Sequence, residues 1–377
     1  MKHTKDLIIL QIIPQLKQGG IERGVLDIFR YLNQKKIKNY IFCENFDSKF
    51  LSDNEKKNIF TSNSIKFKSL KNYFKLNKLL LEIIEKKNIN LVHISSRAPA
   101  FIFNRIITRN KSIKYITGFH NPYMGSFLKK IYNSFLLKGD LIICNSNFTK
   151  QYILRNFDIE DNNIKSIPRG TDLKYFDPSI FGQKSVLKKK KVINIAAKDV
   201  VLTIPSRFSR WKGHYGLISF LNILPEPLLK SLKLILIVDN HHFDKHKILK
   251  KCSKILKKNI RFIKPTNNIR EIYAISDIII SCSSKPEGFG RTISESLAMN
   301  KIPIGINNGG VREQLIGFDS KLLFEPNDMD SFSKSLYYAL YLLKNKNFDG
   351  RSYIQKNYSL SIMLKLTLEA YLSNENR

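Results

Sequence analysis

The sequence SKPEGFGRTISESLAM, residues 284–299, is the stretch from which the organisation of the whole chain can be worked out. An apolar run with strand character, residues 278–280, leads into it, and a proline and two glycines then interrupt any regular structure. After the glycines, Ile293, Leu297 and Ala298 recur at the spacing of one helix face. The stretch therefore predicts a strand, a glycine-containing loop and the first turns of a helix.

The start of this helix has the chemistry of an anion site. The first backbone N–H groups of a helix have no partner within it, and the helix dipole adds positive charge there, so the loop can receive a diphosphate. Glu287 in the loop and Glu295 in the helix lie on either side, where their carboxylates can accept hydrogen bonds from hydroxyl groups. A ligand that carries a diphosphate between two hydroxyl-rich ends would fit these groups, and a nucleotide sugar is such a ligand. The alternative is an ordinary helix start in which acidic residues stabilise the dipole.

The spacing of the two glutamates, with Gly-Phe-Gly directly after the first, resembles the donor site of the family-four retaining glycosyltransferases of the GT-B fold (glycosyl transferases group 1). The segment Asn308–Glu313, NGGVRE, is also similar to that family. The resemblance implies transfer of a hexosyl group from a nucleotide diphosphate sugar, with Glu287 at the sugar and Glu295 at the ribose. The donor-binding residues that it implies here are Glu287, Gly288, Phe289, Gly290 and Glu295, and it makes Glu287 a catalytic residue as well.

A basic loop gives a second strong signal. A predicted strand at 200–204 is followed by Arg207 and Lys212, whose cationic groups can converge on one diphosphate and make it a better leaving group. The loop is similar to the Gly-Arg-x-x-x-x-Lys-Gly of the same family, with Ser206 in place of the first glycine. The resemblance makes Arg207 and Lys212 donor-binding and catalytic residues, whereas without it the segment would be only a basic loop.

The first half of the chain contains three further candidates. A glycine pair, Gly19 and Gly20, opens a predicted helix after the first strand, where the backbone can approach a ligand, although any loop can contain two glycines. The pair is similar to the family's Gly-Gly-x-Glu-Arg turn and is a candidate acceptor-side or phosphate loop. Arg97 follows a predicted strand at 90–94 and is a candidate for an anionic acceptor group, or a solvated loop arginine. His120 follows the strand at 114–118 and, by resemblance, is a catalytic residue near the reacting sugar; a structural hydrogen-bonding role is the alternative.

Short apolar runs alternate with amphipathic ones along both halves, a pattern typical of α/β domains with parallel sheets. The resemblance implies the GT-B arrangement of two facing Rossmann-like domains with a cleft between them. We expect an acceptor domain at 1–178, a linker or surface helix at 179–198, and a nucleotide-sugar domain at 199–354. The last helix, 355–377, is expected to pack back on the first domain.

The chain has 377 residues and a formal net charge of +33, which raises nucleic acid or an anionic membrane as a partner. The sequence contains no cysteine or histidine spacing typical of a zinc site and no recognised nucleic-acid-binding motif. A basic nucleic-acid-binding protein therefore stays the alternative to a glycosyltransferase. Genome composition bias is a further explanation of the charge. The four separated cysteines indicate reduced thiols and a cytoplasmic protein. No segment approaches the ~20 apolar residues of a membrane span, so any contact with the cytoplasmic face of the inner membrane would be peripheral.

No metal or other cofactor is expected. Asp328-Met329-Asp330 has the form of a metal-binding Asp-x-Asp, but its place before a predicted helix at 331–343 favours helix capping. We expect an acceptor hydroxyl on a lipid-linked or other glycan acceptor, in lipopolysaccharide or other cell-envelope synthesis. A soluble sugar or sugar phosphate is the alternative acceptor. The sequence names neither the nucleotide, the sugar nor the linkage.

Overall fold

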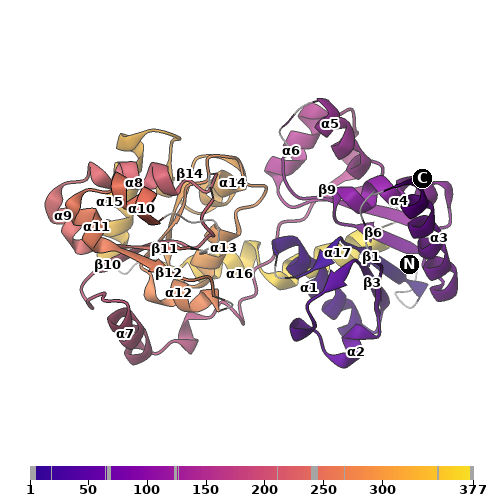
Figure 1. Cartoon of the computed structure of the whole chain (residues 1–377), viewed down its shortest axis with the longest axis horizontal. Helices are drawn as coiled ribbons and strands as arrows, with labels where there is room; N and C mark the ends of the chain where they lie inside the picture. The colour runs from indigo at the N-terminus through magenta and orange to yellow at the C-terminus, as the bar shows by residue number, and fades with distance from the viewer. Residues whose placement is uncertain are drawn as a thin grey trace. The chain divides into compact units, whose positions relative to one another are not determined.

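The computed structural model describes residues 6–17, 19–63, 65, 69–122, 125, 127–209, 211–238, 245–266, 268–345 and 348–373. The chain forms two compact units (Figure 1). Unit 1 comprises Met1–Gly170 and Ser361–Arg377, and unit 2 comprises Thr171–Leu360. Each unit is an α/β domain built on a parallel sheet, as the alternating pattern predicts.

Unit 1 contains a seven-stranded parallel sheet in the order β5-β3-β1-β6-β7-β8-β9. Its strands are β1 (Ile8–Ile12), β3 (Lys38–Cys43), β5 (Ile59–Thr61), β6 (Leu91–Ile94), β7 (Lys114–Phe119), β8 (Leu141–Cys144) and β9 (Ile164–Ser166). Its main helices are α1 (Gly20–Gln34), α3 (Leu70–Lys87), α4 (Arg97–Arg109), α5 (Phe127–Ser134) and α6 (Asn147–Asn156). Two short strands, β2 (Gln15–Leu16) and β4 (Asn45–Phe46), and the helix α2 (Asp53–Lys56) complete it.

Both faces of this sheet are covered. Successive side chains of a strand point to opposite faces, and in β3 Phe42 joins one buried apolar cluster while Ile41 and Cys43 join another. The first cluster includes residues of α3, α4 and α6, and the second includes residues of α1. Strands that are apolar at every position, such as β8, are therefore buried throughout.

Unit 2 repeats the design with six parallel strands in the order β12-β11-β10-β13-β14-β15. The strands are β10 (Val200–Ile204), β11 (Leu232–Ile237), β12 (Ile260–Ile263), β13 (Ile278–Ser281), β14 (Ile302–Ile306) and β15 (Leu323–Phe324). The helices are α7 (Gln183–Val192), α8 (His214–Asn222), α9 (Glu226–Ser231), α10 (Lys245–Lys251), α11 (Lys254–Asn259), α12 (Ile269–Ile275), α13 (Arg291–Ala298), α14 (Gly309–Phe318), α15 (Met329–Asn345) and α16 (Gly350–Asn357). Alternate residues of β10 and β11 again fall into two apolar clusters.

The division between the units differs from the expected domain boundaries. It falls at Gly170–Thr171 instead of at residue 178, and the segment expected as a linker, 179–198, belongs to unit 2 and contains α7. Helix α7 is held to its unit by ion pairs from Lys189 to Glu271 and from Lys190 to Asp277. A lysine-rich composition therefore marks a packed helix here, because the long side chains find acidic partners.

The C-terminal segment is shared between the units. Helix α16 lies in unit 2, where the Arg351 guanidinium donates to the carbonyls of Leu173 and Ala298, at 2.8 and 3.0 Å. The last helix, α17 (Leu360–Leu372), contributes to unit 1 from Ser361 onward. It is bonded there by Lys114, whose ammonium donates to the carbonyl of Ala370 at 3.0 Å. The expected return of the chain to the first domain thus begins at residue 361, not at 355.

Candidate functional site

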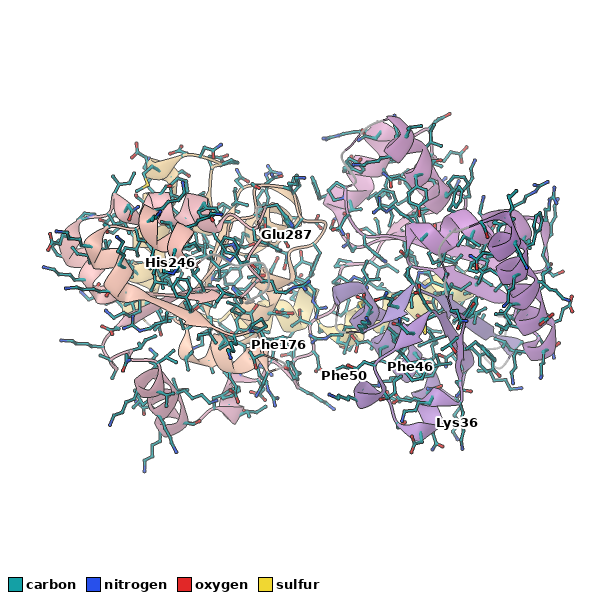
Figure 2. The ribbon with its side chains drawn as sticks, viewed as in Figure 1. Lys36, Phe46, Phe50, Phe176, His246 and Glu287 are labelled. Atoms are coloured by element: carbon teal, nitrogen blue, oxygen red, sulfur yellow. The ribbon has the colours of Figure 1, made fainter. Side chains whose placement is uncertain are left out.

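In unit 2 the loops after β10 and β13 lie next to each other. Strands β10 and β13 are neighbours in the sheet although β11 and β12 separate them in sequence, and the strand order of the sheet reverses between them. Open α/β sheets bind ligands at the carboxyl ends of the strands where the order reverses. We call residues 205–213 the β10 loop and residues 282–290 the β13 loop. Figure 2 labels Glu287, from the β13 loop, close to the position of α14 in Figure 1.

The central contact of the site is an ion pair between the two loops. The Lys212 ammonium lies 2.8 Å from Oε1 of Glu287, and both side chains are mostly buried, with 19% and 16% of their area exposed. The hydroxyl of Ser283 donates to the same carboxylate oxygen. The ammonium also lies over the indole ring of Trp211, 4.3 Å from its centroid. The structure therefore joins two of the residues that the sequence assigned to donor binding.

The backbones of the two loops are also tied together. The amide of Ser284 donates to the carbonyl of Trp211 at 2.8 Å. Gly213 has φ +78°, and a Cβ added there would lie 1.8 Å from the carbonyl oxygen of Cys282. Only glycine combines this left-handed conformation with so close an approach. The glycine of the basic motif is thus explained by the packing of the β13 loop against it.

The NGGVRE segment holds the other side of the β13 loop. The amide of Gly310 donates to the carbonyl of Glu287 at 2.8 Å, and a Cβ at Gly310 would lie 2.5 Å from the Cα of Phe289. Gly309 has φ +60°. The buried amide of Gln314, one turn into α14, donates to the carbonyls of Phe289 and Gly290. Gly288, Phe289 and Gly290 are buried and so form the fixed base of the site.

Glu295 lies on α13 with two partners. The hydroxyl of Tyr273 donates to its Oε2 at 2.9 Å, and Nε of Arg291 lies 3.3 Å from its Oε1. Burial of Tyr273, together with the charge of Glu295, raises the pKa of this phenol well above its usual range. Tyr273 therefore stays protonated and donates. Two partners restrict the position of the Glu295 carboxylate, which matches a group that holds a ligand without taking part in proton transfer.

Arg207 differs from Lys212. Its side chain is exposed on the β10 loop. None of the hydrogen bonds and ion pairs among the described residues joins Arg207 to Lys212 or Glu287. The convergence of Arg207 and Lys212 on one anion thus stays a prediction, whereas the pairing of Lys212 with Glu287 was not foreseen.

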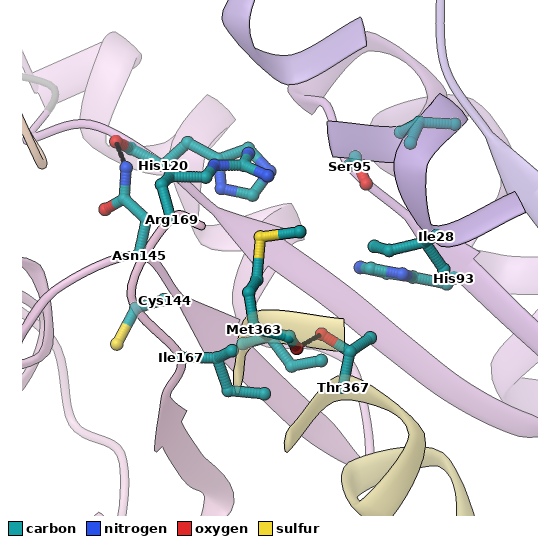
Figure 3. Close-up of a pocket in the computed structure, with 12 residues that line it drawn as sticks. Ile28, His93, Ser95, His120, Cys144, Asn145, Ile167, Arg169, Met363 and Thr367 are labelled. Carbon is teal, nitrogen blue, oxygen red and sulfur yellow. Dashed lines mark hydrogen bonds between the residues drawn. The ribbon is translucent and has the colours of Figure 1, made fainter. Parts of the chain in front are cut away.

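Unit 1 has a pocket at the carboxyl edge of its own sheet (Figure 3). Its volume is about 20 Å³, roughly the room that one water molecule requires. Successive strand ends contribute polar groups to it, and α1 and α17 contribute apolar walls. The polar lining residues are His93, Ser95, His120, Asn145, Arg169 and Thr367, and the apolar ones include Val25, Ile28, Ile167 and Met363.

Two buried imidazoles dominate this pocket. Three ring nitrogens have no hydrogen-bond partner within the described part of the chain: both nitrogens of His120 and Nε2 of His93. Burial, with the charge of Arg169 added, lowers the pKa of His93 to about 3, and burial, Arg169 and His93 together hold the pKa of His120 well below its usual range. Both rings are therefore neutral at neutral pH, and each offers one donor and one acceptor.

Neighbouring residues hold the ring of His93 and the backbone of His120. The hydroxyl of Tyr371, on α17, is hydrogen-bonded to Nδ1 of His93 at 2.7 Å, and the Asn145 amide donates to the carbonyl of His120 at 2.7 Å. A Cβ at Gly118 would lie 2.7 Å from Nε2 of His120 and 3.4 Å from Nε2 of His93. Figure 3 shows the side chain of Arg169 beside the His120 ring. Sequence reasoning gave no role to His93 or Tyr371 and left Arg169 in doubt; strand-end position was the available signal for His93.

The other candidates of the first half lie elsewhere. Arg97 begins α4, and its guanidinium donates to the Asn133 carbonyl oxygen at 3.2 Å and lies 5.7 Å from the Tyr132 ring centroid, so it contacts α5 and does not line the pocket. Gly19 precedes α1, and Gly20 is its first residue. A Cβ at Gly19 would collide with the carboxylate of Glu22 in the first turn. That carboxylate is the end of a flexible side chain and Gly19 has φ −72°, so local packing does not require a glycine at this position.

The capping assignment for the Asp-x-Asp is confirmed. The carboxylate of Asp328 accepts a hydrogen bond from the amide of Ser331 at 2.9 Å, and its carbonyl accepts one from the amide of Phe332. These are the contacts of a residue that precedes a helix, here α15. Ser146 caps α6 in the same way, because its side chain accepts a hydrogen bond from the amide of Thr149.

Comparison with known proteins adds independent evidence. The family model described as Glycosyltransferase Family 4 matches residues 18–175, and the model described as Glycosyl transferases group 1 matches residues 185–353. The crystal structure of a glycosyltransferase from Rickettsia africae ESF-5 has 30% identity and a TM-score of 0.85, and the match covers 98% of each chain. The two matched models follow one another along the chain in the order of units 1 and 2.

Two further proteins are similar over most of their length. A UDP-Gal:alpha-D-GlcNAc-diphosphoundecaprenol alpha-1,3-galactosyltransferase of Escherichia coli is 25% identical over 357 residues, 89% of this chain and 88% of its own. The Anabaena protein Alr3699/HepE, solved in complex with UDP, is 16% identical with a TM-score of 0.78, covering 97% of this chain and 99% of its own, and shows the same fold. Together with the loops that Lys212 and Glu287 join, these matches place the chain in a family: it belongs to the family-four glycosyltransferases of the GT-B fold.

Proposed function

We propose that this glycosyltransferase moves a hexosyl group from a uridine diphosphate sugar to a hydroxyl of a lipid-linked acceptor, with retention at the anomeric carbon. The observation that carries the proposal is the buried contact of Lys212 with Glu287 at the point where the strand order of unit 2 reverses. A cation for the diphosphate and a carboxylate for sugar hydroxyls lie there side by side. The UDP bound by Alr3699/HepE and the UDP-Gal named for the E. coli relative support the choice of nucleotide.

In the proposed reaction the acceptor oxygen forms a bond to the anomeric carbon on the face from which the diphosphate leaves. The bond from that carbon to the phosphate oxygen breaks, and the departing phosphate takes the acceptor's proton. Lys212 and Arg207 offset the charge that develops on the leaving group, and Glu287 holds the sugar as its anomeric carbon becomes positive. The two cations replace a divalent metal in this scheme. Glu295 holds the ribose hydroxyls.

We assign the unit 1 pocket to the acceptor side. Neutral His120 and His93 can each donate to, or accept from, a hydroxyl, and Arg169 can bind an anionic oxygen. A glycan hydroxyl or a phosphate oxygen fits a cavity that has room for about one water molecule. The diphosphoundecaprenol of the E. coli relative supports an acceptor that carries phosphate, and with it a role in lipopolysaccharide or other cell-envelope glycan synthesis at the cytoplasmic face of a membrane.

A lipid-linked acceptor requires access to a membrane surface. No helix in the part of the chain that the structure describes has the length and apolarity to cross a bilayer. Helix α5 instead exposes Leu128 and Ile131, with 75% and 46% of their areas accessible, and carries Lys129 and Lys130 between them. Exposed apolar side chains beside lysines suit an anionic lipid surface. We propose that α5 contributes to this contact.

Thermal unfolding with UDP, UDP-sugars and other nucleotide diphosphates tests the donor. A ligand at 100 times its Kd stabilises the folded chain by about 2.7 kcal/mol. Stabilisation by UDP, and not by guanosine or adenosine diphosphate, is the expected result. If another nucleotide alone stabilises the chain, the uridine assignment is wrong; if none does, the donor site itself is wrong.

Binding to vesicles tests the acceptor side. The chain should bind vesicles that contain anionic lipid more tightly than neutral ones, and Leu128→Asn with Ile131→Asn should weaken that binding. Ile223→Asn is the matched control, because Ile223 is 68% exposed but lies in unit 2. A duplex and a single strand of nucleic acid are tested alongside at the same salt concentration. Tight nucleic-acid binding without vesicle binding would favour a nucleic-acid partner, and transfer to soluble sugars alone would favour the soluble acceptor.

A further inference from the structure

A pocket of unit 2 lies at the amino edge of the sheet, opposite the β10 and β13 loops. It has a volume of about 280 Å³ and is formed by α7 together with the ends of α12 and α13. Its lining is Pro178, Phe181, Gln183, Val186, Leu187, Lys190, Ala274, Met299 and Lys301. Lys301 directly precedes β14, and Asp277, which contacts Lys190, directly precedes β13. The pocket and the donor loops therefore lie at opposite ends of the same strands.

The charges at this pocket do not balance. The Lys190 ammonium, on a side chain with 9% of its area exposed, lies 3.4 Å from Oδ2 of Asp277. Lys301 is also near Asp277, and burial, despite that carboxylate, lowers the pKa of Lys301 while the charge of Lys190 adds to the effect. The oxygen Oδ2 of Asp277 also accepts the amide of Val201 at 2.8 Å. Two ammonium groups thus share one carboxylate that is already partly engaged.

Both ammonium groups keep donors to spare. An ammonium has three donors, and the described contacts of Lys301 use one of them on the carbonyl of Ala274, at 3.0 Å. Burying an unbalanced cation is costly unless an anion accompanies it. One lysine is sufficient to neutralise Asp277 in a salt bridge. The second lysine therefore leaves a positive charge without a counterion, next to a volume large enough for a small ring, and this favours binding of a negatively charged group.

We propose that this amino-edge pocket binds a small organic oxyanion, a phosphate or carboxylate on an apolar ring-sized body, between Lys190 and Lys301. The oxyanion accepts from the two ammonium groups, and the body packs on Phe181, Leu187 and Met299. This site lies outside the proposed reaction and does not depend on it. Because it is at the far end of the strands from Lys212, its ligand binds without displacing the nucleotide.

Titration calorimetry with the full chain tests this, using phenyl phosphate and benzoate as probes and neutral benzyl alcohol as the uncharged comparison, all at constant ionic strength. We expect binding of at least one anion and no comparable binding of the alcohol. Binding of phenyl phosphate alone, or of benzoate alone, names the anionic group. If neither anion binds at millimolar concentration, or the alcohol binds equally well, the proposal is wrong.

Variants locate the binding. Lys190→Met and Leu187→Trp should each weaken the anion at least tenfold, the first by removing a cation and the second by filling the pocket. Leu187 is 39% exposed, so its replacement keeps the core of the unit intact even if Lys190→Met lowers stability. Lys191→Met is the matched control, since Lys191 is exposed on the same helix. Lys212→Met should leave the affinity unchanged.

The opposite pattern overturns the proposal. If Lys212→Met abolishes binding and Leu187→Trp does not, the anion occupies the donor loops instead. Saturating UDP should not displace phenyl phosphate, and if it does, the amino-edge site is also refuted. A chain that fails to bind UDP but binds phenyl phosphate through Lys190 would refute the proposed donor and support the amino-edge site.

Discussion

Lys212 and Glu287 of unit 2 neutralise each other at 2.8 Å, whereas His93 and His120 of unit 1 are buried with ring nitrogens that no described residue engages. In the first site the charges of Lys212 and Glu287 balance each other within the chain. In the second site no described residue meets the buried ring nitrogens, although a buried polar atom without a hydrogen bond costs free energy. The contrast indicates that unit 2 positions its site residues through partners within the chain, whereas the ring nitrogens of unit 1 are available to hydrogen-bond a substrate group.

Glu287→Gln tests the Lys212–Glu287 site of unit 2 and should have the largest effect. If the carboxylate stabilises positive charge that develops on the sugar, turnover should fall by roughly 100-fold, the scale of losing one electrostatic contact to a transition state. Steady-state kinetics with the proposed UDP-sugar donor measures it. Glu226→Gln is the control, since Glu226 forms an exposed ion pair with Lys230. An unchanged turnover number would mean that Glu287 serves only to position Lys212.

Acidification tests the buried histidines of the unit 1 pocket. The pKa of His93 is about 3 in the folded chain, below the usual 6.5, so the unfolded chain binds more protons between these values. Stability should therefore be fully present above about pH 6.5 and fall as the pH drops toward 3, by about 1.4 kcal/mol per pH unit for each such histidine. His120 acts in the same direction.

Thermal unfolding of His93→Gln between pH 7 and 5 measures this slope. The variant should lose less stability on acidification than the natural chain does, and His246→Gln, which changes an exposed histidine, should not differ from it. An equal slope in His93→Gln would show that the buried histidine is not the source of the acid sensitivity.

Glu295→Gln separates the two acids of the donor site and should have a smaller effect. Because Glu295 is expected at ribose hydroxyls that do not change during reaction, the variant should bind UDP and its sugar about fivefold more weakly, the effect of about 1 kcal/mol in a hydrogen bond. Turnover should change little. Calorimetry with UDP measures the affinity, and Tyr273→Phe shows how much depends on the 2.9 Å contact. Equal loss of UDP affinity in Glu287→Gln would refute the division into sugar and ribose ends.

Chelation should have the smallest effect. With Lys212 and Arg207 offsetting the charge of the leaving diphosphate, transfer measured with and without a chelator should be the same within error. Loss of activity that magnesium or manganese restores would contradict the proposed role of the two cations and would require a metal at the diphosphate.

Much of the fold follows from local pattern. The run at 200–204 forms strand β10 at the residues that the sequence indicates, because strands covered on both faces are predominantly apolar. Local residues also mark the ends of α3, since Ser69 caps it and Asn88 takes the left-handed conformation that ends it. The three-residue edge strands β5 and β9 were not predicted, because so short a segment carries no periodic signal.

By itself the sequence determined the α/β architecture, the two loops and glycines of the donor site, and the identities of Glu287, Glu295 and Lys212 as candidates. Tertiary structure alone decided that Lys212 meets Glu287, because β10 and β13 are neighbours in the sheet. It also brought Tyr371 to His93 across 278 positions of sequence. Contacts between distant segments depend on strand order and helix packing, and no local spacing of residues encodes these.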